Sequence, residues 1–192
     1  MVDSILVNDN LSVGKKIAYK TIISVGIIAL AVILPQIVHL VLGRPGGVKW
    51  LPMYLPVLLG GCLLGPGYGA AVGFFSPVIS HFITSAMGSP MPPAARLPFM
   101  TVELVLFGLI SGVFSKKITK TPLWAFPAVI LAQITGRAVF LGIVALARDL
   151  APFTTEMVWE QIKTGFIGLA LQAILVPVIV IVLHKALVKE NE

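Results

Sequence analysis

The sequence predicts an all-α integral membrane protein, a compact bundle of six transmembrane helices. Of the 192 residues, 57% are hydrophobic and only 11% are charged, whereas about a quarter of the residues in a soluble domain are charged. Mean hydropathy is +0.99. The chain also divides into six long apolar runs, and its basic residues fall between these runs. We therefore expect one membrane domain over residues 1–192, beginning with a cytoplasmic segment over residues 1–20.

A membrane span takes about 20 mostly apolar residues, and six runs of the chain approach this length. The first run follows polar or mixed residues with no small-residue cleavage site, so we expect it to remain as a helix. The second is short and contains Pro52, Pro56, Gly60 and Gly61. A bent helix of this kind is tolerated where protein or a water-filled cavity covers the freed backbone groups. The predicted spans are 21–42, 51–66, 68–87, 98–115, 123–147 and 161–185.

Glycines spaced four residues apart occur in the second, third and fourth spans. Small residues at this spacing let helix backbones approach closely. The pattern predicts compaction within one bundle, and it places LGPGYG, residues 64–69, in a tight turn between two spans. These glycines are Gly61, Gly65, Gly69 and Gly73, followed by Gly108 and Gly112.

The distribution of lysine and arginine predicts the orientation, because short cytoplasmic loops carry an excess of both. With six spans, both termini and the 115–122 loop lie on one side, which we expect to be cytoplasmic. Its basic residues are Lys15, Lys16, Lys20, Lys116, Lys117, Lys120, Lys185 and Lys189. The opposite side holds Arg44, Lys49, Arg96, Arg148, Asp149, Glu156 and Glu160.

The net charge of +6 does not indicate nucleic-acid binding, because the basic residues form no stripe interleaved with aromatic residues. The single cysteine, Cys62, lies within an apolar segment, so no intrachain disulfide is possible. The histidines do not have the spacing of a metal site. We expect neither a metal nor a cofactor.

Several polar side chains lie at membrane depth, where a charge costs at least about 2.5–3.5 kcal/mol on insertion scales. With a rise of about 1.5 Å per residue, none of them lies in the cytoplasmic third of its span. This distribution predicts a polar interior that opens outward. The side chains are His39, His81, Glu103, Gln133, Arg137 and Gln172.

These polar groups have structural and ligand-binding interpretations. Glu103 and Arg137 form either a buried ion pair or part of a ligand site, and one carboxylate cannot satisfy all five donors of a guanidinium. The histidines and glutamines either bond between helices or contact the ligand. Trp50 and Tyr54, like Trp159, lie near the outer interface, where aromatic belts form. Trp50 also follows the glycine-rich GRPGGVK, which we expect to be flexible enough to lay the ring over an occupied cavity.

The sequence contains no nucleophile elbow, HExxH or P-loop. The one suggestive pair, a serine such as Ser76 or Ser80 near His81, has no third group to orient it. We therefore expect no enzymatic activity, with an intramembrane enzyme as the least favoured alternative. A small ion-coupled secondary carrier is the other alternative, although no inverted repeat indicates one.

The stretches LPMYLPVLLGG, GYGAAVGFFSPVISHF and MPPAARLPFMTVELVLFG resemble the substrate-binding S component of an energy-coupling factor (ECF) transporter. The resemblance covers roughly residues 20–185. It implies a six-helix protein of the prokaryotic cell membrane that binds a water-soluble vitamin or precursor near the outer face. It also implies that a transmembrane coupling protein and two cytoplasmic ATPases act as partners.

The resemblance places the ligand beneath the first outer loop and among the outer ends of helices four to six. Together with the depth argument, this gives a predicted substrate site of Trp50, Tyr54, His81, Arg96, Glu103, Gln133, Arg137 and Gln172. The family often has alanines four apart where the first helix meets the coupling protein. Here Val25 stands at one such place, and the predicted contact residues are Ser24, Gly26, Ala29 and Ala31.

The vitamin itself is not determined by the fold. An acid, an arginine and few aromatic residues suit a compact polar ligand, so a pyridoxine-like vitamin or precursor is favoured. Pantothenate or lipoate would instead place a carboxylate on Arg137 or Arg96.

Overall fold

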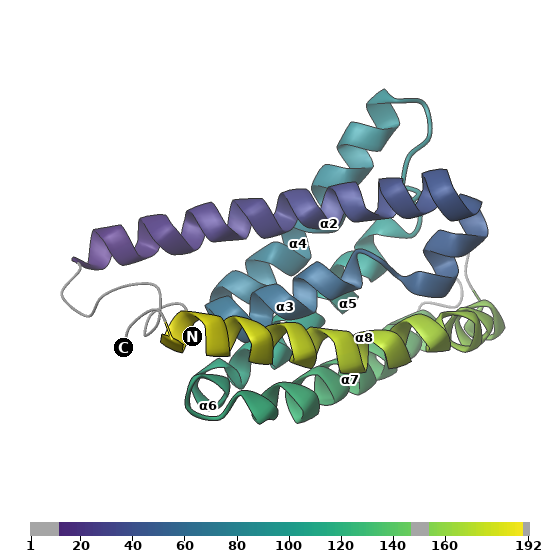
Figure 1. The fold of residues 1–192 in the computed structure, drawn as a ribbon. Helices are drawn as coiled ribbons and strands as arrows, with labels where there is room; N and C mark the ends of the chain where they lie inside the picture. The colour runs from purple at the N-terminus through teal and green to yellow at the C-terminus, as the bar shows by residue number, and fades with distance from the viewer. Residues whose placement is uncertain (1–11, 147–153, 190–192) are drawn as a thin grey trace.

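The computed structural model describes residues 12–146 and 154–189, and in this part of the chain all regular structure is helical. Figure 1 shows α2 along one edge of the bundle and α7 and α8 side by side along the opposite edge, with α3 between them. Residues 1–11 of the predicted N-terminal segment, and Arg148 and Asp149, lie outside the described residues. The helices are α2 (Val13–Trp50), α3 (Tyr54–Leu64), α4 (Pro66–Ala86), α5 (Leu97–Val113), α6 (Ser115–Lys120), η1 (Pro122–Trp124), α7 (Ala125–Leu146) and α8 (Thr155–Lys189).

The predicted membrane spans are confirmed as helices. Five helical segments in the described chain are long and apolar enough to cross a membrane, and α5 is a shorter apolar helix. The second segment is Pro45–Leu64, so it starts six residues earlier than predicted and is interrupted before α3. Large apolar side chains lie exposed along α2, α7 and α8, which is the surface expected of a protein surrounded by lipid. The direction in which the bundle crosses the membrane stays a prediction.

The glycine-rich segment after the first span is helical, and our expectation of a flexible loop there was wrong. Gly43 alone departs from helical geometry, with φ 68° and ψ −176°, a conformation that glycine adopts without steric cost. Pro45 then begins a short helical turn that ends at Trp50, and Leu51 adopts the left-handed conformation with φ 49°. The chain therefore turns twice within nine residues before α3 begins.

The glycines predicted to bring helices together do so where α3, α4 and α5 meet. A Cβ added to Gly69 would overlap the Gly108 carbonyl, and one added to Gly73 would overlap the Leu104 carbonyl. Gly65 has a different role, because its φ of 93° forms the one-residue connection between α3 and α4. This close contact positions Tyr54 on α3 beside α5.

Candidate functional site

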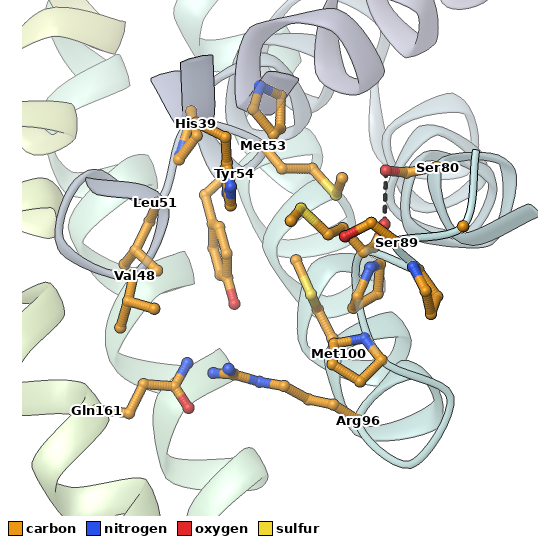
Figure 2. Close-up of a pocket in the computed structure, with 18 residues that line it drawn as sticks. His39, Val48, Leu51, Met53, Tyr54, Ser80, Ser89, Arg96, Met100 and Gln161 are labelled. Carbon is orange, nitrogen blue, oxygen red and sulfur yellow. Dashed lines mark hydrogen bonds between the residues drawn. The ribbon is translucent and has the colours of Figure 1, made fainter. Parts of the chain in front are cut away.

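A cavity of about 480 Å³ lies at the end of the bundle where α2 breaks and where residues 87–96 connect α4 to α5. Figure 2 shows its lining side chains converging from several helices and from this connection. The cavity is lined by Pro35, His39, Gly47, Val48, Leu51, Pro52, Met53, Tyr54, Ser80, Gly88, Ser89, Pro90, Met91, Pro92, Pro93, Arg96, Met100 and Gln161.

One wall of the cavity is the short turn Pro45–Trp50, which is held against α8. Gln172 Nε2 donates hydrogen bonds to the carbonyls of Trp50 (3.1 Å) and Leu51 (2.9 Å). Both carbonyls lie at a helix end, where partners within the helix are lacking, and the Leu51 carbonyl also accepts from the Tyr54 N–H (3.0 Å). Gly168 allows the close approach, because an added Cβ would lie 2.6 Å from the Lys49 carbonyl oxygen. The wall is therefore positioned by a helix more than a hundred residues further along the chain.

The opposite wall is the proline-rich connection, residues 87–96, which is bonded to α4. The Ser80 hydroxyl donates to the Met91 carbonyl (2.8 Å), and the Met91 N–H donates to Thr84 Oγ1 (2.7 Å). His81 Nδ1 lies 2.7 Å from the Pro92 carbonyl oxygen, which can only accept, so this nitrogen carries the hydrogen. One turn of α4 thus fixes the segment that carries Arg96.

The floor of the cavity is the phenol of Tyr54, backed by a buried ion pair. The Tyr54 hydroxyl donates a 2.7 Å hydrogen bond to Glu103 Oε2, and Arg137 Nε lies 3.1 Å from Glu103 Oε1. The Glu103 and Arg137 side chains are 1% and 7% exposed. The Tyr54 ring packs edge-on against Phe107, with centroids 5.2 Å apart. Three helices therefore join behind the cavity through polar groups.

The guanidinium of Arg137 is incompletely satisfied by the described residues. Its Nε and Glu103 Oε1 are close enough to attract, but the N–H direction does not give a hydrogen bond, and neither terminal nitrogen has a partner. Its central carbon lies 5.2 Å from the Tyr54 ring centroid, within reach of a cation–π interaction. Tyr54 thus contacts both members of the ion pair.

Arg96 and Gln161 bring polar groups to the cavity from the end of the 87–96 connection and from α8. Figure 2 shows their side chains pointing toward one another from opposite walls, with the Tyr54 hydroxyl directed into the space between the walls. Arg96 is half-buried and, among the described residues, is the only charged side chain in the lining. The rest of the lining is mostly apolar and includes Met53, Met91 and Met100.

Comparison with protein families matches residues 20–180 to the ECF transporter, substrate-specific component. The chain belongs to this family. Comparisons with curated proteins and with solved structures found no match. The protein is thus the substrate-specific (S) component of an ECF importer, a multi-pass protein of the cell membrane. The family is a transporter family, whose members bind a small substrate and work with a coupling protein and ATPases.

The residues predicted to bind substrate occupy three places in this S component. Tyr54 and Arg96 line the cavity. Glu103 and Arg137 lie behind Tyr54 and outside the lining. The remaining residues make structural contacts: Gln172 bonds to the Trp50 carbonyl, Gln133 Nε2 donates to the Leu169 carbonyl (3.1 Å), and His81 holds Pro92.

Several cavity residues were not predicted. Gln161 lies at the first position of the sixth predicted span, and its amide was the one signal available. The three methionines gave none, because an apolar side chain within or beside a span is equally consistent with lipid contact. For His39 the sequence left open a bond between helices or a ligand contact, and the residue lines the cavity with its Nδ1 buried and unpartnered by the described residues.

The predicted contact residues for the coupling protein lie on two faces of α2. Ser24 and Ala31 are buried within the bundle, and the Ser24 hydroxyl donates to the Lys20 carbonyl (2.8 Å). Gly26 and Ala29 are exposed, as is Val25. In this conformation only the exposed pair is accessible to another protein.

The serine and histidine considered for catalysis are engaged with backbone carbonyls. The Ser76 hydroxyl donates to the Val72 carbonyl (2.7 Å), while Ser80 and His81 bond to the 87–96 connection. No group of three or more His, Cys, Asp or Glu side chains is placed to hold a metal within residues 12–146 and 154–189. The geometry offers no support for hydrolytic chemistry at this pair.

Proposed function

We propose that this S component captures a small water-soluble vitamin or precursor in the cavity lined by Tyr54 and Arg96. A coupling protein and two ATPases would then drive its release into the cell. The cavity carries the proposal. It lies at the bundle end that charge distribution predicts to face outward, and its volume of about 480 Å³ lies within the usual range for small-ligand sites, about 300–1,000 Å³.

Two ligand classes are compatible with this cavity. The pyridoxine-like ligand favoured by the sequence is compact and polar, in keeping with a lining in which, among the described residues, Tyr54 is the single Phe, Tyr or Trp. A carboxylate-bearing vitamin such as pantothenate is the second candidate. The specific observation in its favour is the half-buried cation of Arg96 in the lining, together with the engagement of Arg137 by Glu103.

Native mass spectrometry of the protein purified in detergent tests the binding function. We expect a retained or added vitamin to appear as a stoichiometric mass increment, and Gln161→Leu should weaken its retention. A matched control is Gln133→Leu, because Gln133 bonds α7 to α8 and does not line the cavity. Equal loss of ligand in both variants, or no binding of any vitamin, would contradict the proposal.

Uptake into proteoliposomes tests the dependence on partners. We expect the S component alone to bind the vitamin without accumulating it, and accumulation to require the coupling protein, the ATPases and ATP. Accumulation against a gradient by the S component alone would instead establish a secondary carrier.

A further inference from the structure

We propose that the cavity selects an amphipathic anion: a compact molecule with a carboxylate or similar anionic group held by Arg96, a hydroxyl or N–H group directed to Tyr54, and an apolar arm packed on the methionines. This inference rests on the proposed function and specifies the substrate class of the same site. It favours the carboxylate-bearing class over the pyridoxine-like class.

Arg96 provides the charge selection. Its guanidinium makes no hydrogen bond or ion pair with any residue in the described part of the chain, although the side chain is half-buried at the start of α5. No acidic side chain lines the cavity within the same residues. An arginine fork matches a carboxylate geometrically, and such bonds are stronger than those between neutral groups. A cationic ligand would meet this charge without a compensating acid.

The buried ion pair determines whether the Tyr54 hydroxyl donates or accepts a hydrogen bond on the side of the cavity. Glu103 lies beside the Arg137 guanidinium, and a neighbouring positive charge favours the carboxylate form, which can only accept hydrogen bonds. The Tyr54 hydroxyl consequently donates its hydrogen to Glu103. Toward the cavity the phenol oxygen can then only accept. A matching ligand therefore presents a hydroxyl or N–H hydrogen to this oxygen, at a position deeper in the cavity than its anionic group.

The remaining surface is suited to an apolar arm. Met53, Met91 and Met100 come from three separate segments of the chain, and all three line the cavity. Figure 2 shows Met53 and Met100 on the side of the cavity opposite Leu51 and Val48. Methionine is flexible and polarizable, so it adapts to the shape of an apolar group. The cavity thus combines one cationic end with an adaptable apolar wall.

Two matched pairs of probes isolate the charge: pantothenate with pantothenol, and pyridoxate with pyridoxine. Each pair differs by the replacement of a carboxylate with a hydroxymethyl group. Binding to the purified full chain in nanodiscs is measured by calorimetry. In at least one pair we expect the acid to bind at least about tenfold more tightly than the alcohol, a difference of about 1.4 kcal/mol. In Arg96→Gln the acid should lose this advantage, and the melting temperature without ligand should stay unchanged.

Tyr54→Phe separates the two polar contacts. It should weaken binding of the preferred acid, while the ratio between acid and alcohol stays close to that of the unchanged protein, because Arg96 still provides the charge selection. A control is Lys163→Gln, which removes an exposed cation on α8 that pairs with Glu160 and lies outside the lining. This control should alter neither affinity.

The inference is overturned if the acid is preferred in neither pair, or if the preference survives in Arg96→Gln. If neither acid binds while a neutral or cationic vitamin does, the inference is overturned and the proposed function stands. If no vitamin of any charge binds, both fail.

Discussion

The Tyr54 hydroxyl and the Glu103 carboxylate are joined by a 2.7 Å hydrogen bond between α3 and α5. Tyr54 lines the cavity and Glu103 does not, so this bond connects the cavity to the ion pair behind it. Its geometry depends on close helix packing, on the α2 break and on buried charge. Each of these features leads to a prediction.

Glu103→Gln should strongly destabilise the protein, because it leaves the Arg137 charge buried without its counterion. Removing one partner of a buried pair typically costs about 3–5 kcal/mol. The loss is measured as a lower melting temperature in detergent. Arg137→Gln combined with Glu103→Gln removes both charges and should recover part of the loss. Single and double variants of equal stability would contradict this role for the pair.

Gly69→Ala should destabilise the bundle, since the new Cβ would overlap the backbone of α5 at Gly108. Overpacking of this kind costs about 1–3 kcal/mol. Gly67→Ala is the matched control in α4, because nothing lies within 4 Å of the added atom. Melting temperatures of the two variants provide the comparison, and the predicted contact fails if the two are lowered equally.

Gln172→Leu should reduce ligand affinity as well as stability. The change removes the Gln172 donor from the Trp50 carbonyl and one of two donors from the Leu51 carbonyl, which also accepts from the Tyr54 N–H. An unsatisfied buried polar group costs about 1–3 kcal/mol. Because Leu51 lines the cavity, release of the Pro45–Trp50 turn should also accelerate ligand dissociation. Gln133→Leu removes one bond to α8 and should reduce stability alone. An unchanged rate of ligand dissociation from Gln172→Leu would show that the turn does not contribute to ligand retention.

Thr84→Val should accelerate ligand dissociation by removing the acceptor of the Met91 N–H while conserving side-chain volume. The change loosens the wall that carries Met91 and Arg96, both of which line the cavity. Stopped-flow exchange of bound ligand measures the rate. Thr101→Val serves as the control, since its hydroxyl bonds only to the Leu97 carbonyl within α5. Similar rates in the two variants would argue against this role of the wall.

Ala29→Trp should impair coupled transport without changing ligand binding, because Ala29 lies on the exposed face of α2. Ile134→Trp places the same bulk on α7, at a residue that is 61% exposed, and should be tolerated. Uptake by the full complex and binding by the S component alone are measured in parallel. Normal uptake by Ala29→Trp would indicate that the docking face lies elsewhere on the protein.

The sequence predicted the spans well because hydropathy and length are local properties. It also predicted the close contact of α3, α4 and α5, because glycines four apart mark one face of a helix. The break in α2 was missed in part. Proline and glycine indicated irregularity, but the contacts of the turn with Gln172 and Gly168 on α8 arise only in the tertiary structure.

The polar residues show a second limit of prediction from the sequence. Depth along each span placed Glu103 near the outer end and Arg137 lower, and Tyr54 was noted as an aromatic residue of the outer interface. The structure brings all three together. Depth does not give the rotation of a helix, however. For that reason the sequence could not separate Arg96, which lines the cavity, from Arg137, which pairs behind it.

The sequence by itself determined a six-helix membrane bundle, the order of its spans and the end that carries its polar groups. The tertiary structure alone decided which of those groups face the cavity, and it added Gln161 and three methionines to the lining. The physical reason is that insertion into lipid depends on the apolar content of each segment taken separately. A cavity depends on how helices rotate, cross and break against one another, and those relations arise only when distant segments pack together.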